Sequence, residues 1–310
     1  MAGEQGLALY NAVSRQTSAV LIRSYSTSFG LASRLLPART RRQIETLYAL
    51  VRLADEIVDG VAAAAQVPRT EIGELLDELE ADTERALRIG YSVNLVVHAF
   101  ALTARETGIG TDLTRPFFAS MRADLNQVEH TEASFNEYVY GSAEVVGLMC
   151  LQCFLGGAPL PEDQAKRLRE GAQRLGAAFQ KVNFLRDLAQ DFDNLGRSYF
   201  PGVTVAAFDE ADKYRILDGI DADLLVSGTA VAELPAGCRA AVALAQGLFG
   251  ELARRLRATP AEHLRTTRVR VPNPVKARIA ARAVLTRRVS GPGGHRRSEN
   301  QTVPESERQP

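Results

Sequence analysis

Residues 41–60 read RRQIETLYALVRLADEIVDG, and this stretch decides the fold class. Its apolar residues recur at helical spacing on most of the circumference, which predicts a buried helix. A narrow polar stripe remains, whose members recur at i, i+4, i+7 and i+11: Tyr48, Arg52, Asp55 and Asp59. Two carboxylates one turn apart repel each other, and burial makes their charge costly, so we expect a cation beside them.

The same spacing of aspartates occurs once more, in QAKRLREGAQRLGAAFQKVNFLRDLAQDF at residues 164–192. The polar stripe of this helix consists of Gln180, Asn183, Asp187 and Asp191. Oxygen ligands without His or Cys suit a hard cation, and Mg²⁺ prefers a few carboxylates with waters and substrate phosphate oxygens. The two stripes therefore predict a phosphorylated substrate bridged to aspartates by Mg²⁺, with Mn²⁺ as an alternative ion. The competing interpretation is that these are solvated helix faces whose acids pair with Arg52 and Arg186.

The remaining sequence is helical in pattern nearly throughout, and no segment shows the period-two alternation of a strand. This predicts an all-α, single-domain bundle of roughly eight to ten helices around a central apolar cavity. We expect a lead-in at residues 1–20, the domain at 21–288 and a disordered, almost apolar-free tail at 289–310. Helix breaks are expected at Pro37, 60–68, 108–110, 156–161, 196–202, Gly228, 235–237, Pro260 and 272–274.

The composition excludes several classes of function. Basic and acidic residues number 37 each, which gives no reason to expect a nucleic-acid partner. Three cysteines in 310 residues indicate reduced thiols and a cytoplasmic protein. The N-terminus shows no signal-peptide pattern, and no uninterrupted apolar run reaches the ~18 residues of a spanning helix.

Two short stretches add groups that suit a diphosphate. YSTSFG at residues 25–30 offers the hydroxyls of Ser26 and Ser28, although a helix N-cap is the ordinary use of such serines. GRSYFP at 196–201 follows the second aspartate helix and supplies Arg197, whose guanidinium fork binds phosphate. An unremarkable turn is the alternative for Arg197.

YSTSF, YALVRLADEIVD, YVYGSAEVVG and NFLRDLAQDFDNLGRSYFP resemble, in order, the motifs of the squalene/phytoene synthase family of head-to-head isoprenoid synthases. The resemblance runs from about Tyr25 to about Arg288 and is closest in style to the bacterial phytoene synthases. It implies an all-α fold with a central cavity, in which two allylic diphosphates bind through Mg²⁺ to two aspartate motifs.

The resemblance also assigns residues. The implied metal ligands are Asp55, Asp59, Asn183, Asp187 and Asp191. The implied diphosphate-holding residues are Ser26, Ser28, Arg52, Arg186 and Arg197, while Tyr48 and Tyr138 match tyrosines of the reaction cavity. Two departures concern positioning, since many relatives have Glu at Gln190 and His at Tyr25. A late tyrosine of some relatives aligns only loosely with His263, which we leave unassigned.

The helix YVYGSAEVVGLMCLQCFLGG at residues 138–157 has two interpretations. Ala143, Val146, Gly147, Cys150 and Phe154 recur on one face. Small residues at this spacing are typical of helix–helix packing, whereas the family resemblance implies that the face lines a prenyl tunnel. The C-x-x-C at 150–153 has no second pair, so buried inert thiols are favoured over zinc or redox chemistry.

The favoured function is the joining of two geranylgeranyl diphosphates into phytoene through a cyclopropyl diphosphate, as in carotenoid biosynthesis. Small residues one turn after Phe29, at Ala32 and Ser33, favour a C20 over a C15 substrate. A squalene, dehydrosqualene or hydroxysqualene synthase that uses farnesyl diphosphate is the rival. No G-x-G-x-x-G fingerprint is present and no NADPH is expected for a phytoene synthase. A non-catalytic scaffold relative would have been free to lose the four aspartates.

The basic stretch at residues 265–288 mixes Arg and Lys with apolar residues. This stretch could lie on an anionic membrane surface or be an ordinary surface helix, and the sequence favours neither alternative.

Overall fold

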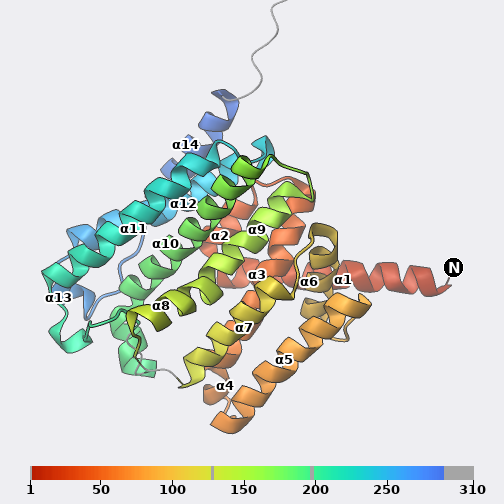
Figure 1. Ribbon diagram of the computed structural model, residues 1–310, viewed down its shortest axis with the longest axis horizontal. Helices are drawn as coiled ribbons and strands as arrows, with labels where there is room; N and C mark the ends of the chain where they lie inside the picture. The colour runs from red at the N-terminus through yellow and green to blue at the C-terminus, as the bar shows by residue number, and fades with distance from the viewer. Residues whose placement is uncertain (1, 127–128, 196–198, 290–310) are drawn as a thin grey trace, which may run out of the picture.

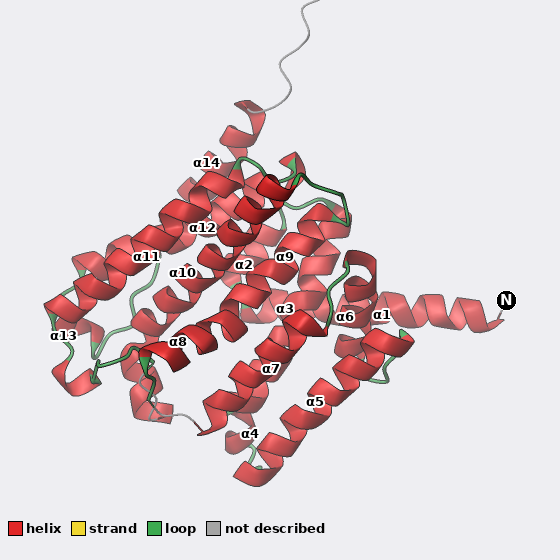
Figure 2. Cartoon of the chain, in the orientation of Figure 1, coloured by secondary structure: helices red, strands yellow, loops and turns green. Residues whose placement is uncertain are grey.

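The computed structural model describes residues 2–126, 129–195 and 199–289, and it describes no side chains at 189–195 or 286–289. These residues form helices and connecting loops without a strand (Figures 1 and 2), as the sequence predicts. The longer helices are α1 (Ala2–Tyr25), α3 (Ala38–Val58), α5 (Arg69–Ile89), α6 (Leu95–Thr107), α7 (Thr111–Asn126), α10 (Glu162–Leu195), α11 (Glu210–Val231), α12 (Ala236–Ala258) and α14 (Asn273–Val289). Shorter ones are α2 (Thr27–Ser33), α4 (Val61–Ala64), α8 (Glu132–Val139), α9 (Val145–Leu155), α13 (Ala261–Leu264) and the turns η1 (Tyr140–Glu144) and η2 (Val205–Ala207).

The core consists of two large apolar clusters, and each contains one aspartate helix. Leu47, Leu50, Ala54 and Val58 of α3 belong to the cluster that α3 forms with α5, α6, α7 and α9. The apolar side of α10 belongs to the other cluster, with α8, α11, α12 and the segment around residue 200. The structure thus confirms that both helices are embedded in the protein.

The run α8–η1–α9 connects the two clusters. Tyr138 and Val139 at its start pack in the α10 cluster, whereas Val145 and Met149 pack in the α3 cluster. The π-turn η1 lies between them, and π-bulges inside helices are frequent at functional sites. A Cβ on Gly141 in this turn would lie 2.2 Å from the carbonyl oxygen of Pro116, so α7 approaches too closely for any larger residue.

The same run, residues 132–155, is long and apolar enough to span a membrane by length and composition alone. Half of its most apolar 18-residue window is buried inside the bundle, and core helices of folded domains pass the same test. Its packing against both clusters accounts for its composition.

Several helices begin directly after a proline, as expected from the sequence, whereas one of the expected helix breaks is wrong. Pro37, Pro68, Pro235 and Pro260 each precede a helix. The break expected at Gly228 is wrong, because this residue lies inside α11. There the missing side chain gives room to Gln246 of α12, whose amide nitrogen would lie 3.1 Å from a Cβ at this position.

The residues expected to form a separate lead-in belong to α1. This helix continues without a break to Tyr25 and packs against α3 and α6. Ser14 and Ser18 of α1 are fully buried. The boundary at residue 20 therefore falls within a helix, and residues 290–310 lie outside the described part of the chain.

Candidate active site

The polar stripe of α3 is tied together by its own side chains and by α2. Arg52 donates from Nε to Glu56 Oε1 at 2.6 Å, and its guanidinium carbon lies 4.5 Å from the centre of the Tyr25 ring. Arg52 thus pairs with Glu56, while its charge also acts on Asp55. Burial raises the pKa of Tyr48, while Arg52 and a side-chain hydrogen bond with Ser26 oppose this rise.

Asp55 has an environment that disfavours its charge. Burial raises the pKa of its carboxyl, and together with the nearby acids Asp59 and Asp124 it brings this pKa from 3.8 to about 8. Arg52 acts in the opposite sense but does not compensate. A desolvated carboxyl with acidic neighbours would gain most from a cation, so this part of the structure fits a divalent metal ion.

Asp124 is a site residue that the sequence analysis missed. It is only 9% exposed, and the hydroxyl of Tyr138 donates to its two carboxylate oxygens at 2.9 and 2.8 Å. The Tyr199 hydroxyl lies 3.2 Å from Asp124 Oδ1. The available signal was an acid on the apolar face of α7, at helical spacing from the buried Phe117 and Met121.

The polar stripe of α10 has a different arrangement. Asp187 accepts hydrogen bonds from its neighbour Arg186, one of them 2.9 Å from Nε to Oδ1. Arg268, in the loop between α13 and α14, approaches the same carboxylate with Nε 2.7 Å from Oδ1. Arg186 thus pairs with an acid of the stripe, as the competing interpretation expects, but the Asp187 side chain is only 16% exposed and does not lie on a solvated face. Arg268 was missed by the sequence analysis because its partner is far away along the chain.

Gln180 and Asn183 are half-buried on the same helix. The side chains of Asp191 and Gln190, and all of Arg197, lie outside the described residues. Within the described side chains, no three His, Cys, Asp or Glu groups lie close enough to hold a metal ion by themselves. Mg²⁺ does not require such a cage, since it usually keeps waters and substrate oxygens as ligands. The metal set stays a prediction.

Aromatic side chains connect the two stripes. Phe184 of α10 stacks on Tyr199 with ring centres 3.9 Å apart and lies 5.9 Å from the Tyr138 ring. Tyr138 in turn holds Asp124, which influences Asp55 on α3. Phe29 of α2 provides a second connection, since its ring lies 5.8 Å from Phe179 of α10. Aromatic rings therefore link α10 to the Tyr138–Asp124 pair and to α2.

The serines of α2 have distinct places. Ser26 is the N-cap of α2 and accepts a hydrogen bond from the Phe29 backbone nitrogen at 3.1 Å, which confirms the capping interpretation. Ser28 is half-buried. Ser33 is 5% exposed and its hydroxyl donates to the Gly30 carbonyl at 3.0 Å.

The small residues of η1 and α9 pack against α10. A Cβ on Gly147 would lie 2.3 Å from the carbonyl oxygen of Ala172, and one on Gly176 would lie 2.4 Å from that of Ala143. These contacts confirm helix–helix packing at Ala143 and Gly147. Val146 is half-buried against the α3 cluster, and the lining of a prenyl tunnel stays a prediction.

The cysteines are unreactive by their surroundings. Burial raises the pKa of Cys150 to about 12 and that of Cys238 to about 11, so both thiols stay protonated at neutral pH. Burial also raises the pKa of Cys153. This agrees with the expectation of inert thiols at the C-x-x-C.

The basic C-terminal helix α14 uses apolar residues for packing. Ala283 is buried against Leu244 and Leu248 of α12, and Ile279 packs against the same cluster. Lys276 donates to the hydroxyl of Thr27 at 3.1 Å. These contacts are those of a surface helix, and membrane contact by α14 stays a prediction.

Comparison with known proteins gives a consistent result. The family model described as squalene/phytoene synthase matches residues 22–274. A 15-cis-phytoene synthase of Synechocystis sp. is 30% identical over 205 residues, which are 64% of this chain and 58% of that protein. A 4,4′-diapophytoene synthase of Staphylococcus haemolyticus is 28% identical over 206 residues, or 66% of this chain and 67% of that protein. The match thus spans less than two thirds of the Synechocystis relative.

Solved structures share the fold. A dehydrosqualene synthase in complex with a ligand superposes with a TM-score of 0.75 at 22% identity, covering 90% of this chain and 98% of that one. A squalene synthase of Alicyclobacillus acidocaldarius gives a TM-score of 0.67 at 20% identity, with coverages of 81% and 97%. Because the family match extends over most of the chain and includes both aspartate helices, this protein belongs to the squalene/phytoene synthase family.

Proposed function

We propose that this protein is a Mg²⁺-dependent prenyltransferase that joins two geranylgeranyl diphosphates head to head, through a cyclopropyl diphosphate, to phytoene. The observation that supports the proposal is the desolvated carboxyl of Asp55 beside Asp59 and Asp124, where the charge of Arg52 only partly offsets burial and the acidic neighbours. Relatives named phytoene synthase at about 30% identity support the choice of product.

Asp55 and Asp59 on α3, with Asn183, Asp187 and Asp191 on α10, are the residues that would hold Mg²⁺. When bound there, Mg²⁺ would supply positive charge that stabilises the diphosphate as it leaves.

The protein's own residues would bind and orient the substrate. Arg52, Arg186 and Arg268 offer guanidinium groups to diphosphate oxygens, in exchange for their present carboxylate partners. Tyr138 is fixed in orientation, because its hydroxyl is held by Asp124 and its ring lies near Phe184. The rings around it would exclude water from a carbocation of the substrate.

Use of farnesyl diphosphate is the second candidate, giving a squalene, dehydrosqualene or hydroxysqualene synthase. The relative from Staphylococcus haemolyticus named 4,4′-diapophytoene synthase supports it about as well as the phytoene synthases do, since identity and coverage are nearly equal. A non-catalytic scaffold ranks third, since Asp55 keeps the costly environment that a scaffold would not need.

The deciding experiment incubates the purified protein with labelled C15 or C20 allylic diphosphate and Mg²⁺, with and without NADPH. Phytoene from the C20 substrate without NADPH is the expected product. A C30 product from the C15 substrate alone would establish the second candidate. Absence of any condensation product would leave only the scaffold.

Chain length has a separate test at Ser33. Replacement by Phe fills space one turn after Phe29, and we expect Ser33→Phe to shift turnover toward shorter prenyl diphosphates. Ala32 packs against Leu244 and Leu248, so Ser33 is the position with space beside it. An unchanged chain-length profile would remove Ser33 from the argument for a C20 substrate.

A further inference from the structure

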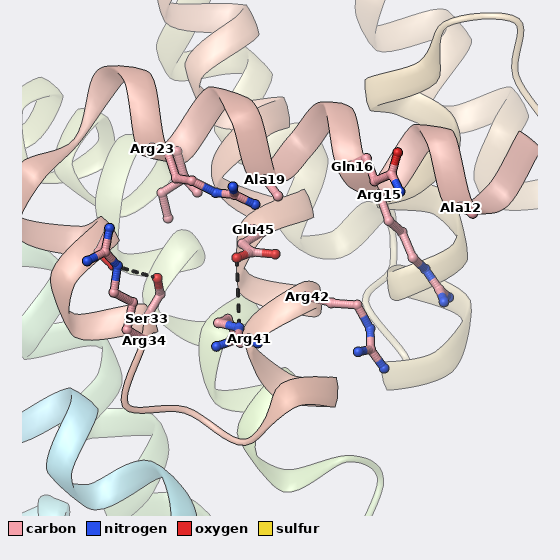
Figure 3. A pocket seen from close by; sticks show the side chains of 12 residues that line it. Ala12, Arg15, Gln16, Ala19, Arg23, Ser33, Arg34, Arg41, Arg42 and Glu45 are labelled. Atoms are coloured by element: carbon pink, nitrogen blue, oxygen red, sulfur yellow. Dashed lines mark hydrogen bonds and ion pairs between the residues drawn. The ribbon is translucent and has the colours of Figure 1, made fainter.

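A cavity of about 720 Å³ lies between α1, α2 and the start of α3. Figure 3 shows the side chains that line it. None of the proposed metal ligands or diphosphate-holding residues lines it, although Ser33 does, the position tested above for chain length. Its charged lining residues are Arg15, Arg23, Arg34, Arg41, Arg42 and Glu45. Five guanidinium groups thus share a cavity with one carboxyl group.

Most of this positive charge lacks a nearby acid. Within the described part of the chain, no carboxylate lies within ion-pair distance of Arg23, Arg34 or Arg42. Arg15 is paired, since its Nη2 lies 2.9 Å from Oε1 of Glu106. The nearest approach inside the cavity is that of Arg41 Nε to Glu45 Oε1, at 4.0 Å.

Glu45 is a weak counter-ion for these arginines. It is 8% exposed, and burial raises the pKa of its carboxyl despite the opposing influence of Arg41, Arg23 and Arg42. The same three arginines line the cavity together with Glu45. Burial therefore disfavours the negative charge of Glu45, although this charge would compensate the neighbouring arginines.

The position of the arginines on α3 adds to the imbalance. Arg41 and Arg42 lie close to the start of this helix, and its first turn carries no acidic residue. The N-terminal end of a helix dipole is positive, so cations there are unfavourable and anions are stabilised. The helix and its arginines therefore act in the same direction.

We propose that this cavity is a second ligand site of the protein, which binds a phosphate-bearing anion through Arg23, Arg42 and their arginine neighbours. Guanidinium groups bind phosphate oxygens by paired, charge-assisted hydrogen bonds, and several around one centre suit a multiply charged group. The proposal does not depend on the reaction catalysed elsewhere in the molecule.

Two sources offer this chemistry. One is a soluble diphosphate, and the other is the head group of an anionic phospholipid. The exposed apolar residues Leu9, Val13 and Val20 lie on α1, the helix that supplies Arg15 and Arg23, where they would contact acyl chains. The experiment separates the two sources.

The first arm measures binding of inorganic diphosphate by calorimetry, with EDTA present so that no divalent ion assists the aspartate helices. The double variant Arg23→Gln/Arg42→Gln should bind about tenfold or more weakly than the wild type. The matched control Arg115→Gln/Arg254→Gln removes two exposed arginines that pair with Glu84 and Glu251, and should bind as the wild type does.

The second arm measures co-sedimentation with phosphatidylcholine vesicles that do or do not contain phosphatidylglycerol. Binding that requires phosphatidylglycerol and is lost in Arg23→Gln/Arg42→Gln supports the site with a lipid head group as its ligand. Loss of diphosphate binding in the first arm supports it with a soluble ligand. No binding of either probe by the wild type, or equal binding by wild type and variant, overturns the proposal.

Glu45→Gln provides a test that does not depend on the folding of the arginine variant. Removing the one carboxyl of the lining should tighten binding of the probe by roughly threefold. Unchanged or weaker binding by a folded Glu45→Gln protein would contradict an anion site at this position.

Discussion

The aspartate pairs of α3 and α10 have the same spacing but opposite surroundings. Asp55 is desolvated among acids, with a pKa raised to about 8. Asp187 is held by two arginines, Arg186 and Arg268, which arrive from its own helix and from a distant loop. Arg52 acts on Asp55 without offsetting its burial, whereas Asp187 is held directly by two arginines. We therefore propose that the two copies of the motif have different roles, in which Asp55 would gain most from a metal ion and Asp187 would exchange an arginine for one.

The largest expected effect is on activity at Asp55, the aspartate whose carboxyl is desolvated. Asp55→Asn should lower kcat/KM about a hundredfold or more, because a metal ligand contributes at least as much as the groups that support it. The measurement is product formation from allylic diphosphates at saturating Mg²⁺. The control is Asp77→Asn, an exposed aspartate of α5 that pairs with Arg122. Wild-type activity in Asp55→Asn would remove α3 from the metal site.

A second test concerns the contact that links the two sides. Tyr138→Phe removes a hydroxyl that donates to Asp124 at 2.8 Å, so the free energy of unfolding should fall by about 1.5–3 kcal/mol. Activity should fall about tenfold or more, because the ring loses its fixed orientation. Urea unfolding and steady-state kinetics give the two values, with Tyr214→Phe on the surface as control. If Tyr138→Phe lost stability but kept full activity, Tyr138 would have a structural role only.

Stability without metal should distinguish the two sides by its dependence on pH. The folded protein keeps the Asp55 proton up to a pKa of about 8, whereas the reference value is 3.8. Folding therefore takes up a proton between these values, and this carboxyl lowers the free energy of unfolding as pH rises through that window. With EDTA present, Asp55→Asn should exceed the wild type in stability at pH 8 by more than about 1.4 kcal/mol.

The expected gain in the free energy of unfolding from Asp55→Asn should shrink toward zero at pH 4, because both folded proteins then carry a neutral group at this position. Asp187→Asn provides the contrast, since it removes the partner of two arginines and should stabilise at neither pH. Equal pH profiles for wild type and Asp55→Asn would show that the carboxyl is not desolvated in solution.

The same comparison shows which features the sequence could predict. The helices and both polar stripes follow from spacing along single segments, so periodicity was sufficient for them. Asp124 and Arg268 depend on contacts across 75 and 81 residues, with Tyr199 and Asp187, and no local pattern encodes such partners. Gly228 was misread for a similar reason, because it lies inside α11 where a side chain of the neighbouring α12 approaches closely.

The smallest expected effect is at Arg268, the loop arginine that pairs with Asp187 of α10. Arg268→Gln removes a half-exposed ion pair, so the free energy of unfolding should change by about 1 kcal/mol or less. KM for the diphosphate should rise severalfold, because the guanidinium that now holds Asp187 is also available to phosphate oxygens. The control is Arg265→Gln, in the same loop and exposed. An unchanged KM together with a higher apparent affinity for Mg²⁺ would mean that Arg268 competes with the metal ion and does not bind substrate. The surroundings of Asp55 and Asp187 would then differ only while Mg²⁺ is absent.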